Sequence, residues 1–130
     1  MALIINNKLL KTITLLLLGI FSSFSLPPYN YFFINFLTFP LLFYILVHNN
    51  DNIFNNFFFG WLFGFGYFLS NLYWISNSLK FDENFENLII FSILFIPFLL
   101  SLFYGLFSTT INLIKLKMDF SSILIFSLIL

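Results

Sequence analysis

Few residues in this sequence carry groups that could act as an acid, a base or a nucleophile. The chain has one histidine, His48, and no cysteine, so it offers neither a thiol nucleophile nor a thiolate metal ligand. Asp82, Glu83 and Glu86 form the one acidic cluster, and clustered carboxylates can serve acid–base chemistry or hold a hard cation. They share a short polar segment with Lys80, and His48 precedes another. We therefore interpret all of these as solvated loop residues and assign no catalytic, cofactor or metal site.

Phosphate and nucleic-acid binding have equally little support. Gly64 and Gly66 lie inside an apolar run and not after a strand, which is the wrong context for a phosphate-binding loop. The basic residues number 5, all of them lysine, and the formal net charge is +0. So few cations cannot line a groove along a phosphate backbone, and we expect no nucleic-acid partner and no bound cofactor.

The composition points instead to lipid as the solvent of this chain. Hydrophobic residues make up 61% of the sequence and charged residues 8%, with a mean hydropathy of +1.02, whereas a typical soluble domain has about 25% charged residues. An apolar exterior is tolerated in a bilayer, where the backbone must be satisfied within helices. We predict an all-α fold, namely a polytopic transmembrane helical bundle of about four full spans plus a partial fifth, with membrane lipids as partners.

The spans follow from the length of the apolar runs, because about 20 apolar residues cross a hydrocarbon core of about 30 Å. The four predicted spans are residues 9–26, 31–48, 56–79 and 88–112. Pro27 and Pro28 end the first span, since proline lacks the backbone N–H and disfavours helix in the residue before it. Pro40 and Pro97 fall inside later spans, where we expect kinks.

Two segments have alternative interpretations. The first span also resembles a cleaved signal peptide, with a basic start, an apolar middle and small residues at Ser23 and Ser25. The last apolar run, 120–130, covers roughly half of a bilayer core. We interpret the chain as a truncation, a split gene product or a fragment of something longer.

The lysines set the orientation, because basic residues favour the cytoplasmic side. With the N-terminus in the cytoplasm, Lys8, Lys11, Lys115 and Lys117 lie inside and only Lys80 lies outside. The opposite orientation would leave one lysine inside and four outside. The aromatic residues near the predicted outer boundaries, as an interfacial belt requires, are Tyr29, Tyr31, Tyr73 and Trp74.

The third predicted span has one face of small and polar residues. Its members are spaced four, three, four, three and four apart, and they are Gly60, Gly64, Tyr67, Asn71, Trp74 and Ser78. At about 100° per residue they stay within roughly 40° of one line. Gly60 and Gly64 allow close approach of another helix, and Asn71 should hydrogen-bond a neighbouring helix. Gly66 lies off this line. We favour a helix-packing seam, and the alternative is the border of a lipid-binding cleft open to the outer leaflet.

Two stretches of the chain resemble a known family. Residues 24–30, Phe-Ser-Leu-Pro-Pro-Tyr-Asn, resemble the Phe-x-x-Pro-(Phe/Tyr)-Asn turn of apolipoprotein N-acyltransferases, and Pro27, Pro28, Tyr29 and Asn30 form that turn. Residues 60–68, Gly-Trp-Leu-Phe-Gly-Phe-Gly-Tyr-Phe, continuing to Tyr73 and Trp74, resemble the Gly-Trp-x-(Phe/Tyr)-Gly-x-Gly-(Phe/Tyr)-Phe pattern of the family's third helix. The second stretch is the more specific of the two.

The resemblance covers nearly all of this chain but roughly the first quarter of a full family member. It implies a multi-pass protein of the bacterial inner membrane. In the family, a later nitrilase-like domain with a Glu-Lys-Cys triad moves an acyl chain from a phospholipid to the N-terminal cysteine of a diacylated lipoprotein, through a thioester. This sequence has no cysteine, so the thioester cannot form on it, and we expect no activity from the chain alone. If the remaining segments are made as a separate chain, that chain is the expected partner.

Two other functions are weighed against this one. The first is a non-enzymatic small membrane protein that oligomerises through the face of Gly60 and Gly64. The second is a remnant of a transporter, which is weaker because ionisable residues are expected along a transport pathway and the middles of the predicted spans contain none.

Overall fold

Every regular element in the described part of the chain is a helix. The computed structural model describes residues 7–27, 29–48, 52–72 and 86–114. The helices are α2 (Lys8–Ser23), the short 3-10 helix η1 (Phe32–Ile34), α3 (Asn35–Val47), α4 (Ile53–Leu72) and α6 (Glu86–Ile114). The all-α prediction is therefore confirmed for these residues.

The helices occupy the apolar runs from which the spans were predicted, with different ends. α2 ends at Ser23 and not at Leu26, and η1 precedes α3 at the start of the second run. Both internal prolines, Pro40 in α3 and Pro97 in α6, lie within continuous helices. The predicted features outside the described residues are Pro28, Tyr73, Trp74, Ser78, Lys80, Asp82, Glu83, Lys115, Lys117 and the run 120–130.

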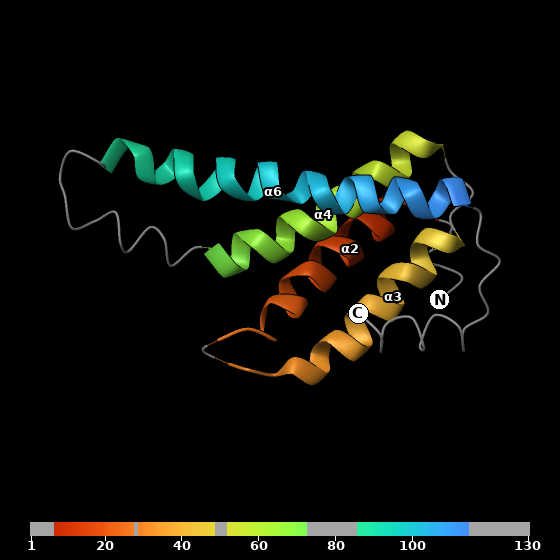
Figure 1. Ribbon diagram of the computed structural model, residues 1–130, viewed down its shortest axis with the longest axis horizontal. Helices are drawn as coiled ribbons and strands as arrows, with labels where there is room; N and C mark the ends of the chain where they lie inside the picture. Colours follow the sequence, from red (N-terminus) through yellow and green to blue (C-terminus); the bar gives the residue numbers. More distant parts are fainter. Residues whose placement is uncertain (1–6, 28, 49–51, 73–85, 115–130) are drawn as a thin grey trace.

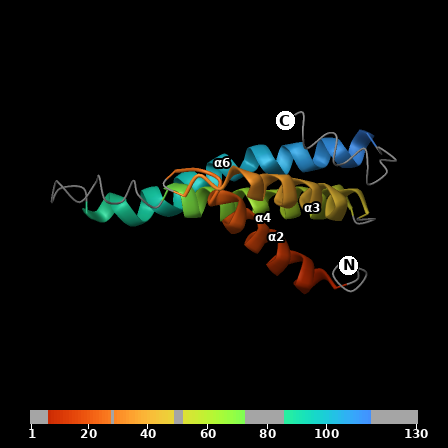
Figure 2. The ribbon, with the colours of Figure 1, turned by 90° about the horizontal axis from the view of Figure 1, so that it is seen from below.

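Successive helices run in alternating directions, so that the first turn of α2, the last turn of α3, the first turn of α4 and the last turn of α6 lie at one end of the molecule (Figure 1). α4 packs extensively on α6 and on α2, whereas α3 makes fewer contacts with each of its neighbours. Seen from below, α2 diverges from the other three helices towards its N-terminus (Figure 2). α4 is therefore the helix around which the others are arranged.

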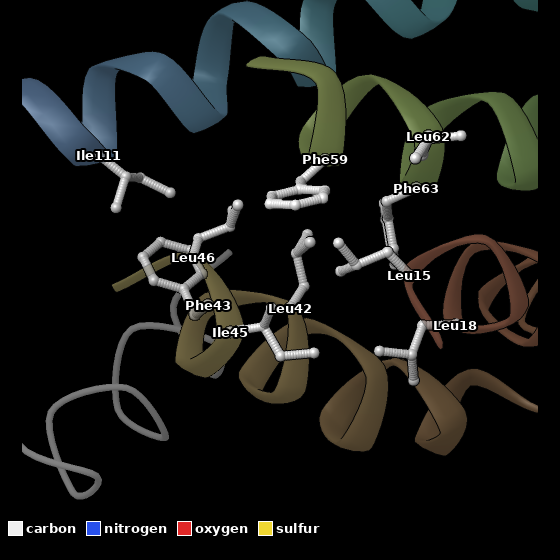
Figure 3. Packing of buried hydrophobic residues seen from close by; sticks show 10 residues of the cluster. All are labelled: Leu15, Leu18, Leu42, Phe43, Ile45, Leu46, Phe59, Leu62, Phe63 and Ile111. Carbon is white, nitrogen blue, oxygen red and sulfur yellow. The ribbon is translucent and has the colours of Figure 1, made fainter. Parts of the chain in front are cut away.

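Apolar side chains from all four helices fill the space between them (Figure 3). Phe59 and Phe63 of α4 and Leu15 of α2 are completely buried there, and α3 contributes Leu42 and Leu46. The other members of this core are Leu18, Phe43, Ile45, Leu62 and Ile111. In water, the hydrophobic effect of burying these side chains would hold the helices together. In lipid, which is itself apolar, van der Waals packing between the helices takes over this role.

The outer surface is also apolar. On α2, large apolar side chains are exposed at four-residue intervals, namely those of Leu9, Ile13, Leu17 and Phe21. One face of this helix is therefore apolar along its length. Large exposed apolar surfaces mark contact with a membrane or another apolar partner. In the described part of the chain, the segment Phe91–Ile111 is long and apolar enough to cross a membrane, and Phe32–Val47 is a shorter apolar helix.

Candidate functional site

The glycines of the predicted face lie against α6. A methyl group added at Gly60 would overlap the Tyr104 carbonyl oxygen and would lie 2.5 Å from Ser108 Cβ. At Gly64 it would lie 2.9 Å from Tyr104 Cβ and 3.1 Å from Ser101 Cα. Such distances leave no room for a side chain, so the two helix backbones approach each other here as closely as glycine permits.

A second pair of glycines brings α4 against α2. A methyl group at Gly66 would lie 2.6 Å from the Leu16 carbonyl oxygen, and one at Gly19 would overlap the carbonyl oxygen of Phe63. Both neighbours are backbone atoms, which cannot rotate away. α4 therefore has two faces on which glycines allow close approach, one towards α6 and one towards α2. Gly19 of α2 contributes to the contact with α4, and it was not identified from the sequence.

Tyr67 and Asn71 continue the predicted face towards the end of α4, where both are half-buried. The Tyr67 ring centroid lies 6.1 Å from that of Tyr104 on α6. Asn71 lies beside Tyr67, and its Nδ2 is buried without a hydrogen-bond partner among the described residues. Among the described residues its amide nitrogen makes no bond to a neighbouring helix, and the predicted hydrogen bond of Asn71 to such a helix stays a prediction. Trp74 and Ser78 lie outside the described residues.

The opposing surface of α6 is also built from small residues, which the sequence analysis missed. Ser101, Gly105 and Ser108 are spaced four and three apart, as Gly60, Gly64 and Tyr67 are on α4. The Ser108 hydroxyl is buried and donates to the Asn56 carbonyl oxygen of α4. The same four-and-three spacing on the two helices is a pattern that could have identified the pair from sequence.

Trp61 holds α6 from an adjacent position on α4. Its indole Nε1–H donates to the Phe98 carbonyl oxygen at 3.2 Å. The indole stacks on Phe65 at 5.2 Å and 16°, and meets the Phe98 ring edge-on at 5.2 Å and 73°. Trp61 is half-buried, and it contacts α6 at this point by a hydrogen bond and by ring packing.

The family-like turn reverses the chain after α2. The backbone N–H groups of Tyr29 and Asn30 both donate to the Leu26 carbonyl oxygen at 3.2 Å. Asn30 has a φ of 56°, a left-handed conformation that asparagine adopts more readily than most residues. Tyr31 N–H then donates to the Phe24 carbonyl oxygen at 3.1 Å. An asparagine in this position is therefore explained by backbone geometry, and the exposed Tyr29 ring packs edge-on against Phe24 at 5.0 Å.

A small hydrogen-bond network ties this turn to α3. The Ser22 hydroxyl donates to Asn35 Oδ1 at 2.7 Å, and Asn35 Nδ2 donates to Ser25 Oγ at 3.0 Å. The Ser25 hydroxyl in turn donates to the Ser22 carbonyl oxygen at 2.8 Å. Both serines are buried. Satisfied polar groups of this kind fix the relative position of two helix ends. Asn35 was not identified as a site residue from the sequence.

The basic residues of α2 lie at the opposite end. Lys11 is only 5% exposed, and its Nζ lies 5.5 Å from the Phe59 ring centroid, a cation–π contact. Lys8 is exposed and donates to Asn55 Oδ1 at 3.4 Å. The sequence predicts that both lysines lie on the cytoplasmic side and set the orientation. Lys11 also has a structural role, because its side chain is buried against α4.

The described side chains form no acid–base or nucleophilic site. Glu86, the only acidic residue within the described ranges, begins α6, and the only histidine, His48, bonds through Nδ1 to the Tyr44 carbonyl oxygen of its own helix at 3.0 Å. The serine hydroxyls discussed above donate to backbone or amide oxygens. The contacts described above pack helices against one another and position a turn.

Comparison with known proteins identifies the same family that residues 24–30 and 60–68 resemble. The family model of the apolipoprotein N-acyltransferase N-terminal domain matches residues 18–130. An apolipoprotein N-acyltransferase of Rhizobium etli is 36% identical over 97 residues, covering 68% of this chain and 18% of the relative. Those of Agrobacterium fabrum and Brucella melitensis are 33% and 31% identical over 105 and 111 residues, covering 74% and 78% of this chain. The chain spans about a fifth of the length of these relatives.

Proposed function

Because this chain belongs to the apolipoprotein N-acyltransferase family, we propose that it forms the N-terminal membrane part of an enzyme that transfers an acyl group to the amino group of an apolipoprotein. The observation that carries the proposal is the match of the family's N-terminal domain to residues 18–130. The glycine-lined contacts around α4 support a packed helical scaffold as its role. In this proposal the described helices hold the rest of the enzyme at the membrane.

We further propose that α2, α3, α4 and α6 each cross the bacterial inner membrane, with the N-terminus in the cytoplasm. Their alternating directions suit successive crossings (Figure 1), and the exposed apolar face of α2 suits contact with lipid. Lys8 and Lys11 lie at the end that would face the cytoplasm, in accordance with the preference of basic residues for that side.

Single-cysteine labelling tests this topology, because the natural chain has no cysteine to remove. Tyr29→Cys places a thiol in the exposed turn between α2 and α3, and Asn52→Cys places one at the opposite end, before α4. A membrane-impermeant maleimide should label Tyr29→Cys in spheroplasts, and should label Asn52→Cys only after the membrane is opened. Equal labelling of the two thiols in intact spheroplasts would refute alternate crossing.

The chain alone should be inactive, because its 130 residues contain no cysteine to carry an acyl thioester. We propose that activity requires a polypeptide carrying the nitrilase-like domain that the family resemblance implies. The test is complementation of a strain depleted of apolipoprotein N-acyltransferase, with this chain alone, with any product of the downstream DNA alone, and with both. Growth and triacylated lipoprotein only when both are present support a split enzyme. Rescue by the chain alone refutes its inactivity.

The alternative, a small membrane protein that oligomerises through Gly60 and Gly64, is less favoured. Both glycines lie against α6 of the same chain, so a second copy could use them only if α6 moved away. Crosslinking in native membranes distinguishes the two functions. A discrete homo-oligomer that is lost in Gly64→Leu, while the monomer persists at its normal level, would support the alternative.

A further inference from the structure

The connection between α2 and α3 differs in character from the one that follows α3. Residues 24–33 are Phe-Ser-Leu-Pro-Pro-Tyr-Asn-Tyr-Phe-Phe, whereas residues 48–52 are His-Asn-Asn-Asp-Asn. Between Lys11 and Asp51 the sequence contains no lysine, arginine, aspartate or glutamate. A cluster of asparagine and aspartate is typical of a loop in water, but a connection made largely of aromatic residues and proline is not. The two ends of the α2–α3 hairpin therefore suit different solvents.

The backbone of this connection makes its hydrogen bonds within the turn. The N–H groups that donate to carbonyl oxygens of nearby residues are those of Phe24, Ser25, Leu26, Tyr29, Asn30, Tyr31, Ile34 and Asn35. Pro27 and Pro28 have no N–H to satisfy. An unbonded backbone group is costly where water is scarce, so a chain segment can enter a lipid layer only if its polar groups are bonded within the protein. The turn fulfils this condition for the N–H groups named here.

The polar side chains beneath the turn are bonded as well. The Ser23 hydroxyl donates to the Ile20 carbonyl oxygen at 2.7 Å, and Ser22, Ser25 and Asn35 form the network described above. The three serines are buried. Because burial of a polar group is costly only when it lacks a hydrogen bond, these groups do not require water around the turn.

The surface of the turn is apolar and largely aromatic. Its large side chains, each with 42–68% of its area exposed, are Leu26, Tyr29, Tyr31, Phe32 and Phe33. Ring contacts connect the aromatic residues in series, from Phe24 to Tyr29 at 5.0 Å, to Tyr31 at 6.4 Å, to Phe33 at 5.8 Å and to Phe32 at 6.1 Å. Aromatic side chains are favoured where lipid headgroups meet acyl chains, and the polar tip of tyrosine suits the headgroup side.

From these observations we propose that the whole α2–α3 turn, backbone included, lies in the outer lipid leaflet. Tyr29 and Asn30 lie in the hydrated headgroup layer, and Phe32 and Phe33 lie at the start of the acyl chains. This goes beyond an interfacial belt, in which aromatic side chains reach the boundary while the connecting backbone stays in water. The turn thereby fixes the depth of the α2–α3 hairpin in the membrane. The inference rests on the proposed membrane location and orientation.

Lipid suits this surface better than a charged segment of the same chain does. Residues 80–87 carry Lys80, Asp82, Glu83 and Glu86, whose charges prefer water, and the turn has no charged group to pair with them. Covering an uncharged aromatic surface with these side chains would remove charge from water without compensation. A zwitterionic lipid layer needs no counter-charge from the turn, and its acyl chains match the phenylalanine rings.

Site-directed spin labelling of the full chain in phosphatidylcholine nanodiscs tests this depth. Single labels are placed at Tyr29→Cys, Phe32→Cys and Phe36→Cys, with Leu17→Cys on the lipid-facing side of α2 and Asn52→Cys in the polar connection as references; all five side chains are exposed. Power saturation compares collisions of the label with oxygen, which is enriched in hydrocarbon, and with a polar nickel chelate, which stays in water. We expect the oxygen-to-nickel ratio of Phe32→Cys to exceed that of Asn52→Cys at least about threefold, and the ratio to rise in the order Tyr29, Phe32, Phe36.

The other outcomes each overturn the proposal in a different way. A ratio at Phe32→Cys equal to that at Asn52→Cys, with a high ratio at Leu17→Cys, would place the turn in water and leave the membrane location intact. Low ratios at both Leu17→Cys and Phe32→Cys would overturn the membrane location together with the inference. Low accessibility of Phe32→Cys to both reagents would show that protein, from this chain or a second copy, covers the turn instead of lipid.

Discussion

Substitution of Gly19 by alanine probes the closest backbone contact between α2 and α4. The added methyl group would overlap the Phe63 carbonyl oxygen and would lie 3.0 Å from both the Phe63 carbonyl carbon and the Tyr67 nitrogen. These atoms belong to the α4 backbone, so relief requires the two helices to separate. Overpacking of this kind costs up to about 3 kcal/mol, and the better helix propensity of alanine returns about 1 kcal/mol. We expect a net loss of about 2 kcal/mol.

Gly105→Ala is the matched control. Its methyl group would lie 2.7 Å from Cε2 and 2.9 Å from Cζ of the Phe57 ring, and the far end of a ring can move without displacing a helix. We therefore expect the free energy of unfolding of Gly105→Ala to stay within about 1 kcal/mol of the natural value, since the gain in helix propensity offsets the crowding.

The assay is reversible unfolding in mixed micelles by titration with sodium dodecyl sulfate, followed by circular dichroism. Gly19→Ala should raise the unfolding equilibrium constant by about 30-fold, the factor that corresponds to about 2 kcal/mol. If Gly19→Ala is as stable as the natural chain, or if Gly105→Ala is destabilised as strongly, then the distinction between backbone and side-chain neighbours is wrong, and so is the close approach of α2 to α4.

Three further substitutions are measured in the same titration. Asn35→Ala removes the centre of the network at the turn and leaves two buried serine hydroxyls short of a partner, so it should cost about 1–3 kcal/mol, and no loss would contradict the network. Ser108→Ala removes the hydrogen bond to the Asn56 carbonyl oxygen and should cost about 0.6 kcal/mol, the usual value between membrane helices; a stabilised variant would contradict that bond. Thr38→Val removes a buried hydroxyl that has no partner among the described residues, and should stabilise the chain by about 1 kcal/mol; a loss would mean that the hydroxyl is bonded.

The helical class followed from the sequence because apolar runs of about 20 residues in a chain with 8% charge leave few alternatives. The ends of the helices were less predictable. α2 ends at Ser23 although the apolar run continues to Leu26, because the turn begins with Phe24 and Ser25, whose backbone N–H groups donate three residues back. Hydropathy records which residues prefer lipid, and it does not record where a turn competes successfully with a helix.

The contacts between helices were the hardest part to predict. The spacing of Gly60 and Gly64 predicted a face of α4 that another helix could approach closely. It did not indicate which helix, and in the structure the partner is α6. Gly19 stands alone in a leucine-rich run and has no spacing pattern, so its contact with Phe63 needed the fold. The role of Asn35 was also hidden, because its two serine partners are 10 and 13 residues away in sequence.

Asn71 can separate the two interpretations of the α4 face. Its Nδ2 is buried without a partner among the described residues, and its side chain is hydrogen-bonded to Tyr67 of the same helix. Asn71→Leu therefore removes one unsatisfied donor and one bond within α4, whereas Asn71→Lys would bury a charge. If the face only packs, Asn71→Leu should accumulate in membranes at or above the natural level and should function normally in the split-enzyme complementation. If the face borders a lipid-binding cleft, Asn71→Leu should accumulate normally but lose function, because the amide that would meet a polar lipid group is gone. Asn71→Lys should lower accumulation in either case, and its normal accumulation would show that water or a partner chain reaches this position.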